Sequence, residues 1–194
     1  KKKAKIMKKK TGKNYDKRSK IEVYKSLKKK YPNLTVQIIP KHYAINHQDK
    51  NFMPLSGLSN TKTLFCNEEG YYSMFESDRY GFNNPNSEWD KNEIEFLLVG
   101  DSFTMGECVN RPNDFASNLR ILSNLSALNL GYSSNGPNIQ LAVLREYLDP
   151  KVKKVLWMYY EGNDLKDLED TKNSKILSKY ILNKEFTQNL KLRQ

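Results

Sequence analysis

The sequence predicts a protein of the α/β class, built on a parallel sheet. Short apolar runs at 94–99, 127–130 and 155–160 each lead into a turn that contains glycine. Helical patterns at 113–123 and 138–147 lie between these runs. Strands that alternate with helices in this way are typical of βαβ units, whose strands run parallel. We therefore expect a βαβαβ core with right-handed crossovers.

The segment that precedes this core, residues 19–92, is expected to be a small α+β extension. Apolar residues recur mostly at helical spacing from 19 to 31, and Pro32 ends the pattern. A strand is predicted at 35–39, where Pro40 closes it. Residues 41–61 are polar, with a composition typical of turns and linkers.

A hairpin is predicted from the two runs 63–66 and 71–75, which flank a turn. The turn-rich stretch 77–85 then leads to the first core strand, and its aromatic side chains are expected to pack under the sheet rather than to bind a ligand. The core is expected to span 93–194. Beyond Asp164, apolar residues at helical spacing predict one or two amphipathic helices.

Positive charge is concentrated at the start of the chain. The sequence has 33 Lys and Arg against 22 Asp and Glu, a net charge of +11. Residues 1–30 hold 15 of the basic residues and only two acidic ones, so the rest of the chain is nearly neutral. We therefore expect no nucleic-acid partner for the globular part. Residues 1–18 are expected to form a disordered basic arm that can contact an anionic membrane surface.

The sequence contains no run of 18 apolar residues, so it predicts no transmembrane helix and no signal peptide within its limits. An anchor directly before Lys1 would fit the basic flank. A cytoplasmic and a membrane-anchored location therefore both stay open.

The strand at 94–99 runs into Gly100-Asp101-Ser102, a common way to display a nucleophilic serine. Gly100 permits a sharp turn that leaves the Ser102 hydroxyl at the carboxyl edge of the sheet. Alone, the tripeptide is a weak signal, because Asp and Ser are ordinary turn and capping residues. The other two strands lead into turns with Gly131 and with Gly162-Asn163-Asp164, and these strengthen the signal.

The three strand ends, in this order, resemble blocks I, II and III of the SGNH (GDSL-like) hydrolases over residues 94–165. The resemblance implies a flavodoxin-like three-layer α/β/α fold with a parallel sheet. It also implies that Ser102 is the nucleophile, with an oxyanion hole made by its own N–H, the N–H of Gly131 and the amide of Asn163. Fixed donors of this kind contribute roughly 3 kcal/mol each. Residues 55–85 resemble the segment before the catalytic domain in a bacterial subgroup of the family.

Asp101 and Asn135 are further candidate site residues. For Asp101 we prefer a cap on the following helix to a role in catalysis or substrate binding. Asn135 can hydrogen-bond a substrate next to Gly131, although a turn asparagine before Gly136-Pro137 is the simpler interpretation.

The chain departs from the family pattern in its general base. The family carries an Asp-x-x-His pair near its C-terminus, whereas the only histidines here, His42 and His47, precede Ser102. The base is necessary, because a serine at its free pKa is a poor nucleophile. The family's sheet has about five strands, and this chain supplies three. We therefore expect the sequence to be part of a longer protein, with its core domain incomplete at the C-terminus.

Other chemistries do not fit the spacing of the residues. Residues 100–106 contain neither a phosphate-binding P-loop nor a dinucleotide-binding glycine pattern. Thr104 breaks the Gly-x-Ser-x-Gly elbow of the α/β-hydrolases. No His-Glu-x-x-His motif is present. We expect neither a cofactor nor a metal.

The two cysteines, Cys66 and Cys108, are too few for a disulfide scaffold and have no metal-ligating partner at short spacing. A bridge between them would tie the predicted hairpin to the active-site edge in an exported protein. Free thiols are an equal alternative.

These observations predict a serine-dependent ester hydrolase that acts through an acyl-enzyme. The family resemblance implies esters of carbohydrates or lipids, and O-acetyl groups on polysaccharide are the preferred substrate. An O-acyltransferase with the same site is one alternative. A catalytically silent binding or accessory domain with this fold is another.

Overall fold

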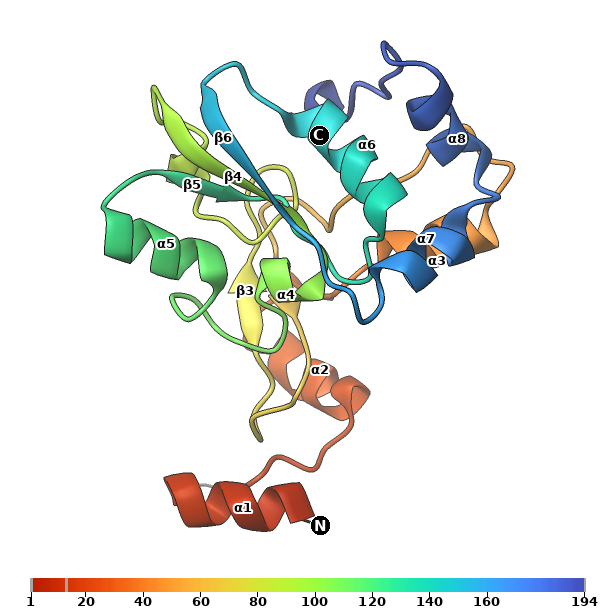
Figure 1. The fold of residues 1–194 in the computed structure, drawn as a ribbon. Coiled ribbons are helices and arrows are strands. Elements are labelled where there is room, and N and C mark those ends of the chain that lie inside the picture. The colour runs from red at the N-terminus through yellow and green to blue at the C-terminus, as the bar shows by residue number, and fades with distance from the viewer. Residues whose placement is uncertain (1, 13, 194) are drawn as a thin grey trace.

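The computed structural model describes residues 2–12 and 14–193. These residues contain two three-stranded sheets (Figure 1). The core sheet has the order β5–β4–β6, and both strand pairs are parallel. Its strands are β4 (Ile94–Gly100), β5 (Ala127–Asn129) and β6 (Val152–Met158). The α/β class and the parallel core predicted from the sequence are therefore confirmed.

Helices cover both faces of this sheet (Figure 1). Successive side chains of a strand point to opposite faces. Leu98 accordingly packs with residues of α5 (Phe115–Ser123), whereas Leu97 and Val99 belong to the cluster that contains residues of α6 (Pro137–Tyr147). The helices predicted at 113–123 and 138–147 are confirmed as α5 and α6.

The second sheet lies in the N-terminal segment. Strand β1 (Leu34–Val36) pairs in parallel with β2 (Lys62–Leu64), and β2 pairs antiparallel with β3 (Met74–Glu76). The antiparallel pair confirms the predicted hairpin. Helix α2 (Lys20–Lys28) covers this sheet through Val23, and a capping box between Ser19 and Glu22 fixes its start.

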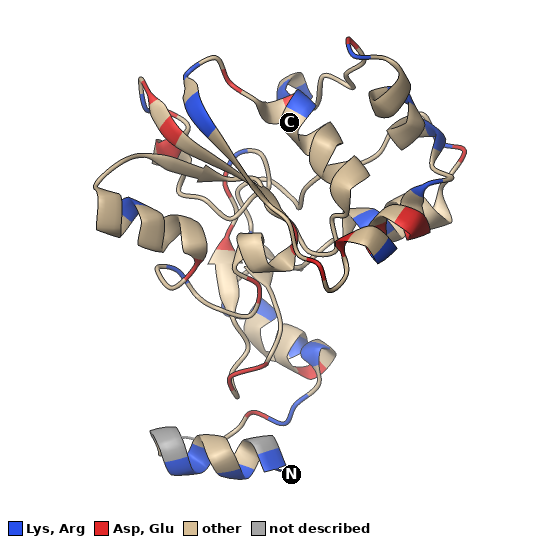
Figure 2. Cartoon of the chain, in the orientation of Figure 1, with Lys and Arg blue, Asp and Glu red and all other residues tan. Residues whose placement is uncertain are grey.

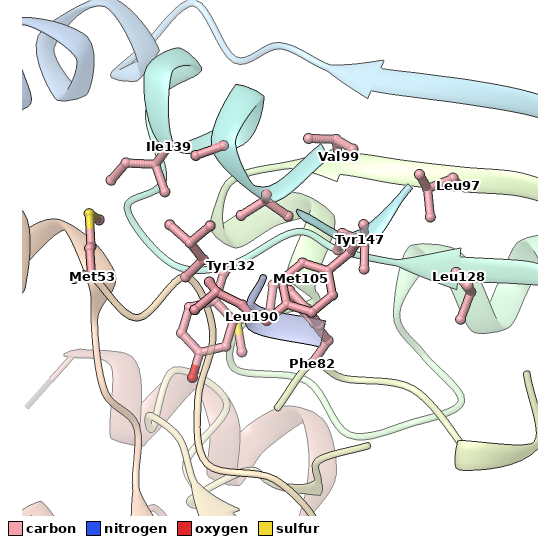
Figure 3. Packing of buried hydrophobic residues seen from close by; sticks show 14 of the residues in the cluster. Met53, Phe82, Leu97, Val99, Met105, Leu128, Tyr132, Ile139, Tyr147 and Leu190 are labelled. Carbon is pink, nitrogen blue, oxygen red and sulfur yellow. The ribbon is translucent and has the colours of Figure 1, made fainter. Parts of the chain in front are cut away.

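The main hydrophobic core joins the N-terminal segment to the parallel sheet (Figure 3). Phe82 is fully buried, with ring centroids 5.0 Å from Tyr147 and 6.4 Å from Tyr132. Met53 and Phe65 belong to the same cluster. The prediction that aromatic residues of 77–85 pack under the sheet is confirmed for Phe82.

Asp78 fixes the loop that carries Phe82. Its buried carboxylate accepts hydrogen bonds from the backbone N–H groups of Tyr80 and Phe82 at 2.8 and 2.9 Å. It also accepts from the side chains of Asn84 and Trp89, both at 2.8 Å. One carboxylate therefore organises the loop, and the side chains of Asn83 and Asn84 bind it to the core by donating to the backbone oxygens of Met105 and Asn129.

Two segments differ from the sequence-based expectation. Helix α1 (Lys2–Thr11) forms where a disordered arm is predicted, in a stretch without Gly or Pro and rich in the good helix formers Lys, Ala and Met. Helix α3 (Pro40–Asn46) forms in the stretch that has linker composition. Pro40 closes the preceding extended segment, but it also occupies the first turn of α3, a position that suits proline.

The helices predicted beyond Asp164 are present as α7 (Asp164–Thr171) and α8 (Lys175–Leu182). Two short 3₁₀ helices are also present in the described part of the chain, η1 (Asn86–Glu88) and η2 (Leu190–Leu192). Across the described residues, the helices are all too short or too polar to cross a bilayer.

Candidate functional site

Ser102 is the first residue of the short helix α4 (Ser102–Met105), directly after the end of β4. Asp101 is the N-cap, and its Oδ1 accepts a hydrogen bond from the backbone N–H of Phe103 at 2.9 Å. The predicted cap is therefore confirmed. The motif places Ser102 at the carboxyl edge of the parallel sheet, as expected.

Ser102 lines a pocket of about 510 Å³. Its walls come from α4, from the loop that links α4 to α5, and from the hairpin at Cys66 and Glu68. A volume of this size is in the range of small-molecule sites, about 300–1,000 Å³. The lining contains neither Gly131 nor Asn163.

Asn163 follows β6 and lies close to Asp101 at the same sheet edge. Burial raises the pKa of the Asp101 carboxyl, and the N–H of Phe103 and the amide of Asn163 partly offset this rise. The Nδ2 of Asn163 donates to Asp167 Oδ2 at 2.9 Å, while its buried Oδ1 has no partner among the described residues. The structure therefore brings Asp101 and Asn163 together.

Gly131 packs directly against α4. Its N–H, which the family resemblance directs at an oxyanion, donates to Asn129 Oδ1 at 2.9 Å. A Cβ added to Gly131 would lie 2.6 Å from Thr104 Cβ and 2.7 Å from the backbone nitrogen of Met105. A glycine is thus required here because α4 passes too close for any side chain.

Asn135 is fully buried in the turn before α6. Its side-chain nitrogen and oxygen have no hydrogen-bond partner in the described part of the chain, whereas its backbone oxygen accepts from Gln140 Nε2 at 2.6 Å. An unpaired buried amide is costly. The predicted substrate contact of Asn135 stays a prediction.

Neither histidine lies in the pocket of Ser102. His42 is exposed on α3, and the ring of His47 stacks on Tyr43 with centroids 4.4 Å apart. The same helix places Lys41 Nζ 2.6 Å from Asp167 Oδ1. Helix α3 therefore supports α7 and does not supply a base to Ser102.

Sequence reasoning missed Asn129 and Asp167, which position the predicted site residues. Asn129 is fully buried, accepts from Gly131 and donates through Nδ2 to the backbone oxygen of Thr104 at 2.6 Å. Asp167 holds Asn163 and Lys41. Asn129 interrupts the apolar run 127–130, and this is the local signal that could have indicated it; Asp167 lies in a polar stretch and gives no such signal.

The wall of the pocket includes a disulfide between Cys66 and Cys108, which resolves the two alternatives left by the sequence. It joins the β2–β3 hairpin to the loop after α4. Among the described residues, Cys66, Cys108 and Glu107 form the one cluster with metal-ligand spacing. The two sulfurs are bonded to each other, so this cluster does not offer a set of metal ligands.

The fold and the site define a protein of the mixed α/β class with a half-buried serine at a sheet edge. Comparisons with models of protein families, with curated proteins and with solved structures find no match to this chain. The resemblance to SGNH hydrolases therefore stands on the three motifs themselves.

Proposed function

We propose that the protein is a serine ester hydrolase of the SGNH type, with Ser102 as the nucleophile. The observation that carries this proposal is the position of Ser102, which starts a capped helix at the carboxyl end of β4 and lines a pocket of ligand size. The proposal includes the finer fold assignment, in which β5–β4–β6 are three strands of a flavodoxin-like sheet.

In the proposed reaction, Ser102 Oγ attacks the carbonyl carbon of an ester. The tetrahedral intermediate collapses with release of the alcohol, which takes up the serine proton, and leaves an acyl group on Oγ. Water then hydrolyses this acyl-enzyme to the carboxylic acid and free serine. The preferred substrates are O-acetyl or other O-acyl esters of carbohydrate or lipid.

The first step requires a base that removes the serine proton. No imidazole from the described residues lines the pocket. We therefore expect Ser102 of this chain to react slowly by itself and faster when an external base is supplied.

A fluorophosphonate probe, with the adduct mapped by peptide mass, tests this proposal. We expect slow labelling of Ser102 that added imidazole accelerates and that Ser102→Ala abolishes. Ser178→Ala, on α8 and outside the pocket, is the matched control and should label like the parent chain. Absence of an adduct on Ser102 in the presence of imidazole would refute an activatable nucleophile.

A catalytically silent binding domain is the second candidate. Two of the predicted oxyanion donors have internal partners, because the Gly131 N–H donates to Asn129 and the Asn163 amide donates to Asp167. This second function is favoured if the probe leaves Ser102 unmodified in a chain that is otherwise folded.

The basic N-terminal segment is proposed to contact an anionic membrane surface. Figure 2 shows lysines along α1, which lies at one end of the molecule, and on α2, which packs on the N-terminal sheet. Each basic residue near such a surface contributes about 1 kcal/mol. We expect co-sedimentation with vesicles that contain phosphatidylserine, weaker binding at high salt, and markedly weaker binding when residues 1–18, which include α1, are deleted. Equal binding to neutral vesicles would refute the electrostatic contact.

A further inference from the structure

The pocket that contains Ser102 carries negative charge. Glu68, Glu107 and Asp114 line it, and none of its lining residues is Lys or Arg. Asp114 is occupied as the cap of α5, where it accepts from Ser117 N and Oγ at 3.0 and 2.6 Å. Two glutamates remain to interact with a ligand.

Glu107 is held in place within this pocket. Its Oε2 accepts a hydrogen bond from Ser133 Oγ at 2.5 Å, and its Oε1 lies 3.9 Å from Cys66 Sγ. Glu68 lies on the exposed turn of the hairpin at the rim. Among the described residues, neither glutamate forms an ion pair with Lys or Arg, so both charges are available to a ligand.

Two phenylalanines line the same pocket. Phe103 and Phe115 are 58% and 53% exposed, although phenylalanine normally avoids water. The ring of Phe103 packs on Tyr160, with centroids 4.6 Å apart, which holds it at the rim. Exposed aromatic rings and carboxylates that line one pocket are two features that suit an ammonium group, because the first attract cations through the ring face and the second through their charge.

We propose that this pocket binds a cationic ammonium group, and that the ester acted on by Ser102 carries such a group near the scissile bond. The proposal rests on the ester hydrolase assignment and extends it by naming its substrate class. A single carboxylate at about 4 Å from a cation improves affinity roughly fivefold in bulk water. Neutral esters lack this attraction, and anionic esters are repelled.

Choline and its uncharged isostere 3,3-dimethylbutan-1-ol test the charge preference without any turnover. Amide chemical shifts of the ¹⁵N-labelled protein report the affinity for each. We expect choline to bind at least about fivefold more tightly, with the largest shifts at residues 103–109. The preference should disappear in the double variant Glu68→Gln, Glu107→Gln. The amide introduced by Glu107→Gln keeps an oxygen that can accept the hydrogen bond from Ser133.

Glu185→Gln removes one negative charge from an exposed loop outside the pocket and should leave the preference unchanged. If the double variant does not fold, Glu68→Gln alone and a salt titration of the parent chain replace it, and both should reduce the preference. Equal affinity for the two ligands, or a preference that survives the double substitution, overturns the cationic pocket.

The probe experiment separates this inference from the proposed function. Choline preference without an adduct on Ser102 supports the cation site and refutes the hydrolase. An adduct without choline preference supports the hydrolase and refutes the cation site.

Discussion

Gly131→Ala separates two roles of this glycine, a donor to an oxyanion and a close contact with α4. Alanine keeps the backbone N–H, so a role as donor alone predicts an unchanged stability. In the structure the new Cβ would lie 2.6 Å from Thr104 Cβ and 2.7 Å from Met105 N. The second atom is backbone, and it can move only if α4 moves with it.

Overpacking of a rigid site costs typically 1–3 kcal/mol. Because the neighbour is backbone, we expect the free energy of unfolding to fall by about 2–3 kcal/mol, close to the upper end of that range. For a chain of this size, that corresponds to a decrease in Tm of roughly 4–12 °C. The displacement of α4 should also slow the labelling of Ser102.

Urea unfolding followed by circular dichroism measures the effect. Gly162→Ala is the matched control, because its Cβ would meet ring atoms of Tyr160, a half-exposed side chain that can rotate away. A Gly131→Ala protein whose unfolding free energy is within about 0.5 kcal/mol of the parent value would refute the close-contact role.

Three further changes test other parts of the structure. Asp78→Ala removes the acceptor of four N–H groups, three of them buried and one partly buried, so we expect a loss of roughly 3–5 kcal/mol in urea unfolding; a loss below about 1 kcal/mol would contradict the role of this carboxylate. Replacing Cys66 and Cys108 by serine opens a loop with a sequence separation of 42, and stability should fall by roughly 3–4 kcal/mol relative to the oxidised parent; an unchanged midpoint would argue against the bridge. Lys191 Nζ lies 2.8 Å from Asp149 Oδ2 and holds the pKa of that carboxyl below its usual range. The stability that this ion pair contributes is complete above the ordinary aspartate pKa of about 3.9 and is lost as the pH falls through the lowered pKa. Lys191→Met should therefore remove up to about 1 kcal/mol at neutral pH and reduce the slope of the stability curve in acid. An acid limb of unchanged slope would contradict this ion pair.

The sequence predicted those parts of the fold that local patterns determine. The apolar runs located β4, β5 and β6, and the helical spacing located α5 and α6. Both differences between prediction and structure arise where the same residues are compatible with two local structures. Pro40 can end a strand or begin a helix, and the lysine-rich start can be a solvated arm or α1.

The candidate site was predictable only in part, because much of it depends on pairs that are distant in the sequence. The cap by Asp101 is local and was predicted, whereas the bond from Lys41 to Asp167 spans 126 positions. The internal partner of the Gly131 N–H depends on the rotamer of Asn129, which no sequence pattern reports. The negative charge of the Ser102 pocket likewise arises only where the fold brings the hairpin beside the α4–α5 loop.

The N-terminal segment and the parallel sheet share one hydrophobic core, so the chain does not divide into two independent halves. Since Phe82 packs against Tyr132 and Tyr147, a cut between residues 92 and 93 would divide one hydrophobic cluster between two fragments. Residues 93–194 expressed alone would present both tyrosine rings to solvent and should be prone to aggregation. A fragment that contains the parallel sheet therefore needs to include the Phe82 loop as well.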